Sequence, residues 1–250
     1  FSLSFPSQWS TTTSTIDNFN ASVNWASVVV PTSTPTPTPV QQATCLTLPQ
    51  TDNFTGSTIS AQLWKFWSHQ AGLVNQNGGV LSASMPGAVS GFAGLNTQNK
   101  ICGDFDVRVD FNQFTTSGQA EGHAALIILN EDNNAEVRIQ RYSKVNEQGF
   151  WTDMKKPDGT YFGGIQANAL TTFGKLRIRR QGSVFTTYYF DEENGGWKKL
   201  GYFPSGFTSN ANVIIGVGSW TQNPSVSANF DNFNLTNDIP DPSMFAQVQP

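Results

Sequence analysis

The sequence has few charged side chains and no long hydrophobic run. Charged residues make up 13% of the 250 residues, about half of their share in an average soluble protein. The net charge of −4 and the lack of a Lys/Arg cluster argue against nucleic acid or an anionic membrane as a partner. No stretch of about 18 apolar residues is present, so we expect no membrane span. The chain has no initiator Met and no charged-then-apolar leader, which predicts a mature chain or a fragment.

Residue types that dominate many catalytic and metal sites are also scarce. The two histidines, His69 and His123, give no persuasive Ser/His/Asp arrangement, and no zinc-like spacing or phosphate-binding glycine loop is found. The two cysteines, Cys45 and Cys102, either form one disulfide or are two free buried thiols. A Thr/Pro tract at residues 31–39 is typical of exported proteins, which favours the disulfide and an extracellular or cell-surface location.

Neutral polar residues, turn formers and aromatics take the share of the composition that charged residues usually have; the chain contains 22 Gly, 13 Pro, 19 Phe and 7 Trp. This composition favours many short strands over helices. Alternation of apolar and polar residues is clearest at 105–111, 135–142 and 175–179, and Ala124–Leu129 is apolar throughout, as expected for a central strand. We therefore predict an all-β fold in which two antiparallel sheets pack face to face as a jelly-roll sandwich. Further strands are expected at 184–190, 197–202, 213–218 and 225–235.

The chain divides into four parts by composition. Residues 1–30 contain strand-like pieces, residues 31–44 form a Thr/Pro-rich linker, residues 45–236 are the sandwich, and residues 237–250 are a tail. The tripeptide Asp-Asn-Phe occurs at 17–19, 52–54 and 231–233, and the first copy matches the third over further residues. The repeat suggests that residues 1–30 are the closing strand of a preceding or neighbouring copy of the domain.

Possible glycosylation sites follow from short patterns. Asn20, Asn53 and Asn234 each fit the N-glycosylation acceptor pattern, and the Thr/Pro tract offers Thr34, Thr36 and Thr38 for O-glycosylation. These sites matter only if the source organism glycosylates.

Several phrases in the body of the chain resemble one family. They are the stretch from Thr51-Asp-Asn-Phe to Trp64, then Gly103-Asp-Phe-Asp-Val-Arg-Val-Asp-Phe111, Gly216-Val-Gly-Ser-Trp220 and Phe230-Asp-Asn-Phe233. Over about residues 50–235 the chain resembles the concanavalin A-like, laminin-G-like jelly-roll domains of secreted bacterial proteins. The resemblance implies the fold; for function it implies a group of sugar-binding modules, accessory sandwiches of glycoside hydrolases, adhesins and some enzymes.

Catalysis has little support in the sequence. The lichenase and laminarinase enzymes of this superfamily carry Glu-x-Asp-x-x-Glu on one strand, and this chain has no such motif. The alternative carboxylate pair is Glu121 and Asp153, facing one another across a groove. The expectation is a module without catalytic residues.

Sugar binding needs aromatic rings and a few planar polar groups, and the outward faces of the expected strands supply both. Arg138, and also Arg141, can equally be charges on an outer sheet face, and each Trp can pack in the core or at its rim. The candidate ligand-binding residues are Glu121, His123, Arg138, Gln140, Tyr142, Trp151, Asp153 and Trp220.

Calcium is the one cofactor that the sequence suggests; no organic cofactor is expected. Asp52 and Asp231 stand in matching Asp-Asn-Phe phrases on the expected first and last strands, where lectin-like jelly rolls often bind Ca²⁺. The alternative is that each Asp caps a turn or accepts backbone hydrogen bonds.

Together these observations predict a secreted, non-catalytic carbohydrate-binding or adhesion module whose partner is a glycan or cell-surface polysaccharide. One alternative is a structural subunit of an extracellular assembly or filament, joined to other copies of itself through its N-terminal strand. A second alternative is a glycoside hydrolase.

Overall fold

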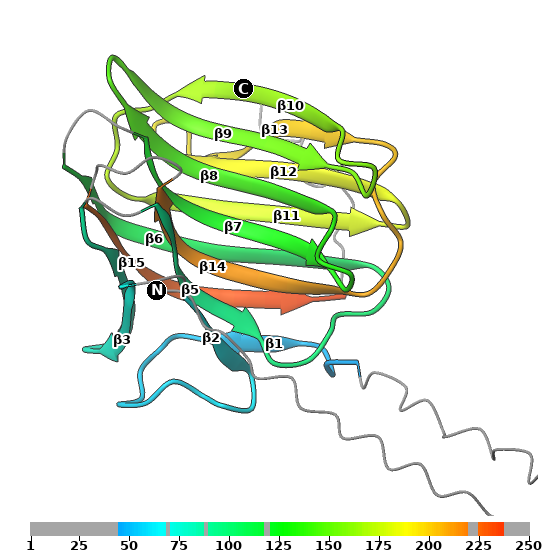
Figure 1. The fold of residues 1–250 in the computed structure, drawn as a ribbon, viewed down its shortest axis with the longest axis horizontal. Helices are drawn as coiled ribbons and strands as arrows, with labels where there is room; N and C mark the ends of the chain where they lie inside the picture. The colour runs from blue at the N-terminus through cyan, green and yellow to red at the C-terminus, as the bar shows by residue number, and fades with distance from the viewer. Residues whose placement is uncertain (1–44, 69–70, 88–89, 118–120, 220–224, 238–250) are drawn as a thin grey trace, which may run out of the picture. The chain divides into compact units, whose positions relative to one another are not determined.

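The computed structural model describes residues 45–68, 71–87, 90–117, 121–219 and 225–237, and these form β-strands and turns without a helix. The N-terminal strand segment, the linker and most of the tail lie outside the described residues, so the predictions for them stay predictions. The domain is an antiparallel two-sheet sandwich, as the alternation predicts (Figure 1).

The first sheet has eight strands in the order β13-β12-β11-β6-β15-β4-β3, with β1 added beside β15. Its strands are β1 (Gln50–Asp52), β3 (Leu73–Asn77), β4 (Val80–Met85), β6 (Phe105–Thr116), β11 (Gly174–Gln181), β12 (Val184–Asp191), β13 (Gly196–Phe203) and β15 (Val226–Thr236).

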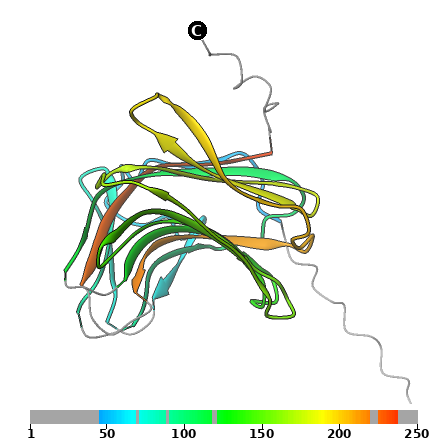
Figure 2. The same cartoon turned by 90° about the horizontal axis from the view of Figure 1, so that it is seen from above.

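The second sheet has seven strands in the order β10-β9-β8-β7-β14-β5-β2. Its strands are β2 (Trp64–Ser68), β5 (Gly91–Thr97), β7 (Gly122–Asn130), β8 (Glu136–Lys144), β9 (Glu147–Lys155), β10 (Tyr161–Asn168) and β14 (Ala211–Ser219). Figure 2 shows this sheet bowed, with its hollow side turned away from the eight-stranded sheet.

The core lies between the inner faces of the two sheets. Phe105, Val107, Val109 and Phe111 alternate along β6 and are almost completely buried, as their spacing predicts. The hairpin turns expected at Asn133-Asn134, Asp158-Gly159, Gln181-Gly182 and 194–196 also join consecutive strands. Burial of these large apolar side chains stabilises the sandwich, at about 25 cal/mol for each Å² removed from water.

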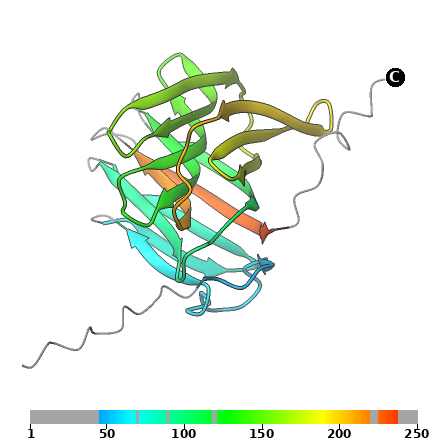
Figure 3. The same ribbon diagram turned by 90° about the vertical axis from the view of Figure 1, so that its right-hand side faces the viewer.

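Two copies of Asp-Asn-Phe meet where β1 pairs with β15 (Figure 3). The ring centroid of Trp64 lies 6.2 Å from that of Phe54 and 4.7 Å from that of Phe233. The carboxylate of Asp52 accepts hydrogen bonds from Trp64 Nε1 and from the Phe54 amide, both at 2.8 Å. The two copies of the tripeptide therefore join the first and last strands of the domain, because residues from both copies contact the indole of Trp64.

A disulfide joins Cys45 to Cys102, with 5.7 Å between their Cα atoms. The alternative of two free thiols is wrong. The bridge is supported by the backbone, since the amide of Leu46 donates to the carbonyl of Lys100 at 2.7 Å. It ties the start of the described chain to the segment that leads into β6.

Candidate functional site

An apolar patch covers part of the outer, hollow face of the seven-stranded sheet. Its members are buried although they point away from the core, and Trp67 of β2 packs against them at the edge. We call this group the outer patch: Phe92, Ala125, Ile127, Leu129 and Ile214. An antiparallel sheet normally turns a polar face to water, so an apolar outer face is a candidate contact surface.

A pocket of about 530 Å³ opens over the outer patch, a volume within the usual range for small-molecule sites. It extends from the paired residues Gly91 and Ser219 to Asn133 in the β7–β8 turn. Trp67 and Glu136 line its sides. The pocket is therefore lined by an aromatic ring, an apolar floor and a carboxyl group.

Glycines make the floor flat enough for an aromatic ring. A Cβ added at Gly216 would lie 2.8 Å from Cε1 of Phe92, and one at Gly218 would lie 2.9 Å from its Cδ2. The Phe92 ring consequently rests directly on the β14 backbone, and larger residues at these positions would displace it. This explains why β14 carries Gly216 and Gly218 on its outer face.

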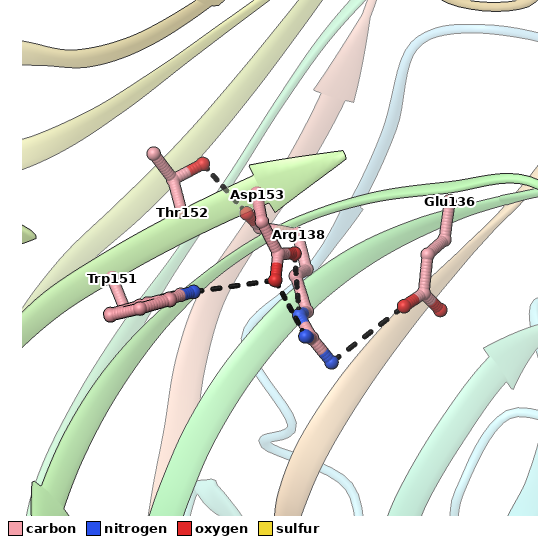
Figure 4. A network of polar contacts seen from close by, with 5 residues as sticks. All are labelled: Glu136, Arg138, Trp151, Thr152 and Asp153. Atoms are coloured by element: carbon pink, nitrogen blue, oxygen red, sulfur yellow. Dashed lines mark hydrogen bonds and ion pairs between the residues drawn. The ribbon is translucent and has the colours of Figure 1, made fainter. Parts of the chain in front are cut away.

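A cluster of polar side chains lies beside the pocket on β8 and β9. The Arg138 guanidinium donates to Asp153 through Nε and Nη2, both at 2.6 Å, and its Nη1 lies 3.6 Å from a Glu136 oxygen. The Trp151 indole donates to the same Asp153 carboxylate at 3.3 Å. Figure 4 shows Arg138 held between the two acids. We call Glu136, Arg138, Trp151 and Asp153 the polar cluster.

Burial and charge set the ionisation of the cluster. Burial raises the pKa of the Glu136 carboxyl, and the Arg138 charge only partly offsets this. Burial by itself lowers the pKa of Arg138, but the hydrogen bonds and the charge of Asp153 outweigh it, so the net shift is upward. The two-point ion pair fixes the orientation of Asp153, whereas Glu136 has only the longer contact with Arg138 to offset its burial.

Register brings most of the predicted ligand-binding residues together. Gln140 lies between Ala125 and Trp151, and Arg138 lies between Ile127 and Asp153. His123, Gln140 and Tyr142 are on this outer face as predicted, but all three are at most 2% exposed. They support their neighbours instead of presenting a surface to a ligand.

Two other candidates have different outcomes. Glu121 precedes Gly122, which pairs with Ser143, whereas Asp153 pairs with Arg138. Five residues along a strand correspond to about 17 Å, so Glu121 and Asp153 do not face one another, and the suggested carboxylate pair is not formed. Trp220 lies outside the described residues.

The sequence analysis missed Trp67, Phe92, Glu136 and Ile214 as members of this site. The uninterrupted apolar run Ala124–Leu129 predicts a central strand, and β7 is one, with β14 and β8 as its neighbours. In an antiparallel sandwich such a run also signals an apolar outer face. Recognising that would have pointed to Ile127 and Leu129.

Calcium binding stays a prediction. β1 and β15 are neighbours, as expected, but both carboxylate oxygens of Asp52 accept hydrogen bonds from protein groups, and Asp231 accepts one from the Asn232 amide at 2.6 Å. Within the part of the chain that the structure describes, no group of three His, Cys, Asp or Glu side chains is placed to hold a metal ion.

The glycosylation sites also stay predictions. Asn53 is exposed, and Asn234 is half-buried within β15, opposite Thr51. The remaining acceptors precede the described residues.

In the described ranges there is no helix that is long and apolar enough to cross a membrane.

Fold and topology define the class of the protein: it is a concanavalin A-like jelly-roll sandwich. Residues 41–238 match the family model described as the C domain of a protein of unknown function (DUF1583), and the chain belongs to this family. No match was found among curated proteins.

Solved structures share the fold at low sequence identity. The beta-glucanase of Bacillus licheniformis is 10% identical with a TM-score of 0.54, and the match covers 75% of this chain and 97% of that one. A functionally unknown protein from Saccharomyces cerevisiae is 11% identical with a TM-score of 0.55, covering 71% and 97%. Xyloglucan PUL GH43B of Bacteroides ovatus is 15% identical with a TM-score of 0.59, and this match spans 78% of the present chain and only 40% of that one.

Proposed function

We propose that this protein is a secreted or cell-surface carbohydrate-binding module that holds a glycan on the hollow outer face of the seven-stranded sheet, without cleaving it. The observation that carries the proposal is the pocket in which Trp67 and the outer patch adjoin the polar cluster. Aromatic and apolar surfaces pack against sugar rings, and planar charged groups hydrogen-bond their hydroxyls.

The two tryptophans have complementary positions at this face. Trp67 is half-buried at the β2 edge, and Trp151 is half-buried on β9. A Cβ at Gly164 would lie 3.2 Å from the Trp151 ring, so the indole packs against the β10 backbone. Two rigid rings flanking an apolar floor suit an extended chain of several sugar units.

Binding is tested first with a glycan array and then by calorimetry on the glycans that bind. We expect Trp67→Ala and Trp151→Ala each to weaken binding about five- to thirtyfold, since losing one aromatic contact with a desolvated ring removes roughly 1–2 kcal/mol. Phe66→Ala is the matched control: this neighbour of Trp67 is 63% exposed and belongs to the opposite side of β2. Unchanged binding by the Trp67 variant, or an array on which nothing binds, would refute the proposal.

Hydrolysis is the second candidate, and one observation favours it. Glu136 lines the pocket and has a raised pKa, which is the property of a general acid, and the acid Asp153 lies across Arg138 from it. Release of reducing ends from a bound glycan by the wild type, abolished in Glu136→Gln, would establish a hydrolase. A binding module releases none, and Glu136→Gln changes only its affinity.

A further inference from the structure

A second cavity, of about 450 Å³, lies on the opposite outer face, that of the eight-stranded sheet. Strands β1, β6, β11, β12, β13 and β15 and the residues next to β1 all contribute to it, and none of its lining residues belongs to the outer patch or the polar cluster. We call it the second cavity: Thr51, Asn53, Arg108, Asp110, Lys175, Phe190, Trp197, Asn232, Phe233 and Asn234.

Two β-bulges shape this cavity. The β12–β13 pairing shifts register between Thr187 and Tyr188, and Figure 2 shows the far end of this hairpin standing away from the sheet. The β15–β6 pairing shifts between Asp231 and Asn234, where Asn232 has a φ of 51°. Bulges bend a strand and redirect its side chains, so Trp197 and Asn232 come to line one hollow.

Positive charge concentrates on this face although the whole chain carries a net charge of −4. Along β6 and β11 the outward positions hold the cations Arg108, Lys175, Arg177 and Arg179 and the acids Asp106 and Asp110. Four cations stand against two acids on these two strands, and Asp231 on the neighbouring β15 pairs with Asp110, so the strip keeps a positive charge of one, which favours an anionic ligand.

The acids are already engaged. Arg177 forms a buried ion pair with Asp106, with its Nε 2.8 Å from Oδ1. Lys175 Nζ lies 3.2 Å from Asp110 Oδ2, the oxygen that also accepts from Asn232 at 3.1 Å.

Arg108 differs from these cations. Its side chain is exposed and lines the cavity, and no described residue makes a hydrogen bond or an ion pair with its guanidinium. A guanidinium with no partner among the described residues can donate two parallel hydrogen bonds to the oxygens of a carboxylate or a sulfate.

The rest of the lining suits a sugar. Phe190 and Trp197 pack edge to face with centroids 5.5 Å apart, and they supply an aromatic wall. The amides of Asn53, Asn232 and Asn234 and the hydroxyl of Thr51 supply donors and acceptors for hydroxyl groups. A bare inorganic anion would make no use of the aromatic wall.

We propose that the second cavity binds an acidic saccharide, with Arg108 pairing with the anionic group, Trp197 packing against the ring and the asparagine amides contacting the hydroxyls. Carboxylated and sulfated sugars share this chemistry. The site is separate from the hollow face of the seven-stranded sheet and does not depend on the function proposed for that face.

The test is calorimetric titration with three probes: a trisaccharide of galacturonic acid, a trisaccharide of galactose 6-sulfate, and neutral galactotriose. We expect at least one anionic probe to bind about tenfold more tightly than the neutral probe. The preference should shrink in 0.5 M salt, because salt screens exposed charges. The probe that binds identifies the anionic group.

Variants locate the interaction. Arg108→Gln should abolish the preference for the anionic probe, whereas Arg108→Lys keeps the charge without the fork and should retain part of it. Trp197→Ala should weaken all binding at this site. Lys65→Gln, which removes an exposed charge from β2 of the other sheet, should change nothing, and neither should Trp67→Ala.

Any one of four results would overturn the proposal. Three concern the saccharide probes: equal binding of charged and neutral probes by the wild type, no binding of any probe, and an undiminished anionic preference in Arg108→Gln. Tighter binding of a single-stranded oligothymidylate than of every saccharide would also overturn it.

Discussion

Removing the Cys45–Cys102 disulfide is expected to lower the free energy of unfolding by about 4 kcal/mol. The bridge spans 57 residues of sequence, and in the chain-entropy model closing a loop of this length costs the unfolded chain roughly that amount. The bond also holds the segment that leads into β1, whose three residues pair only with β15. Loss of the disulfide therefore has two effects: it gives the unfolded chain more conformational freedom, and it removes a covalent link next to β1 in the folded state.

The measurement is urea unfolding of the wild type and of the Cys45→Ser, Cys102→Ser double variant, each with and without reductant. Reductant should bring the wild type to the stability of the double variant and leave the double variant unchanged. A difference below about 1 kcal/mol between the oxidised wild type and the double variant would show that the loop gains little from closure, contrary to the entropic argument.

Acidification from pH 6.5 to 4.5 is expected to cost the wild type about 2 kcal/mol of stability through His123 alone. Burial, with a smaller contribution from the Arg138 charge, lowers the pKa of this histidine from 6.5 to about 3. Above pH 6.5 the imidazole is neutral in both states. Below it the unfolded chain gains a proton that the folded chain does not, so stability falls until the pH reaches the folded pKa.

His123→Gln isolates this contribution, because glutamine is polar but does not titrate. Urea unfolding at pH 6.5 and 4.5 is compared for both proteins, so that the titration of all other groups cancels in the double difference. The variant should lose about 2 kcal/mol less than the wild type over this interval. Parallel pH profiles would mean that His123 becomes protonated in the folded state.

The alternation of side chains was enough to predict most strands and the all-β class. Residues 105–111 and 175–179 each have one apolar face, and both segments lie in the eight-stranded sheet with those faces in the core. Residue types at the turns were equally informative, because Asn and Gly tolerate the backbone conformations that tight hairpins need.

One arginine lies on the other face of its strand from the one expected. Arg141 differs by three residues from Arg138 and so points to the opposite face of β8; it is 1% exposed, and its Nε donates to the carbonyl of Thr171 at 2.8 Å. The interpretation as an outer-face charge is wrong. A buried arginine of this kind is stabilised by backbone carbonyls, which a sequence pattern does not reveal.

Neither candidate site could be assembled from sequence, because each depends on which distant strands pair. Arg108 lies next to Asn234, and Asn234 lies next to Thr51, through the pairing of β6 with β15 and of β15 with β1. Such register is fixed by tertiary packing and by bulges. The sequence pointed to Arg138, Trp151 and Asp153 of the polar cluster but not to Glu136, and only strand pairing placed all four beside the outer patch.

The disulfide also determines how the domain would carry tension. A pull on the chain ahead of Cys45 passes through the sulfur bridge to Cys102 and on into β6, so strands β1 to β5 are bypassed within a covalent loop. A pull on the other end reaches β15, whose Thr236 pairs with Asp106 near the start of β6. The load would therefore peel β15 from β6 starting at this end, and among the looped strands it would reach first β1 and β4, which also pair with β15.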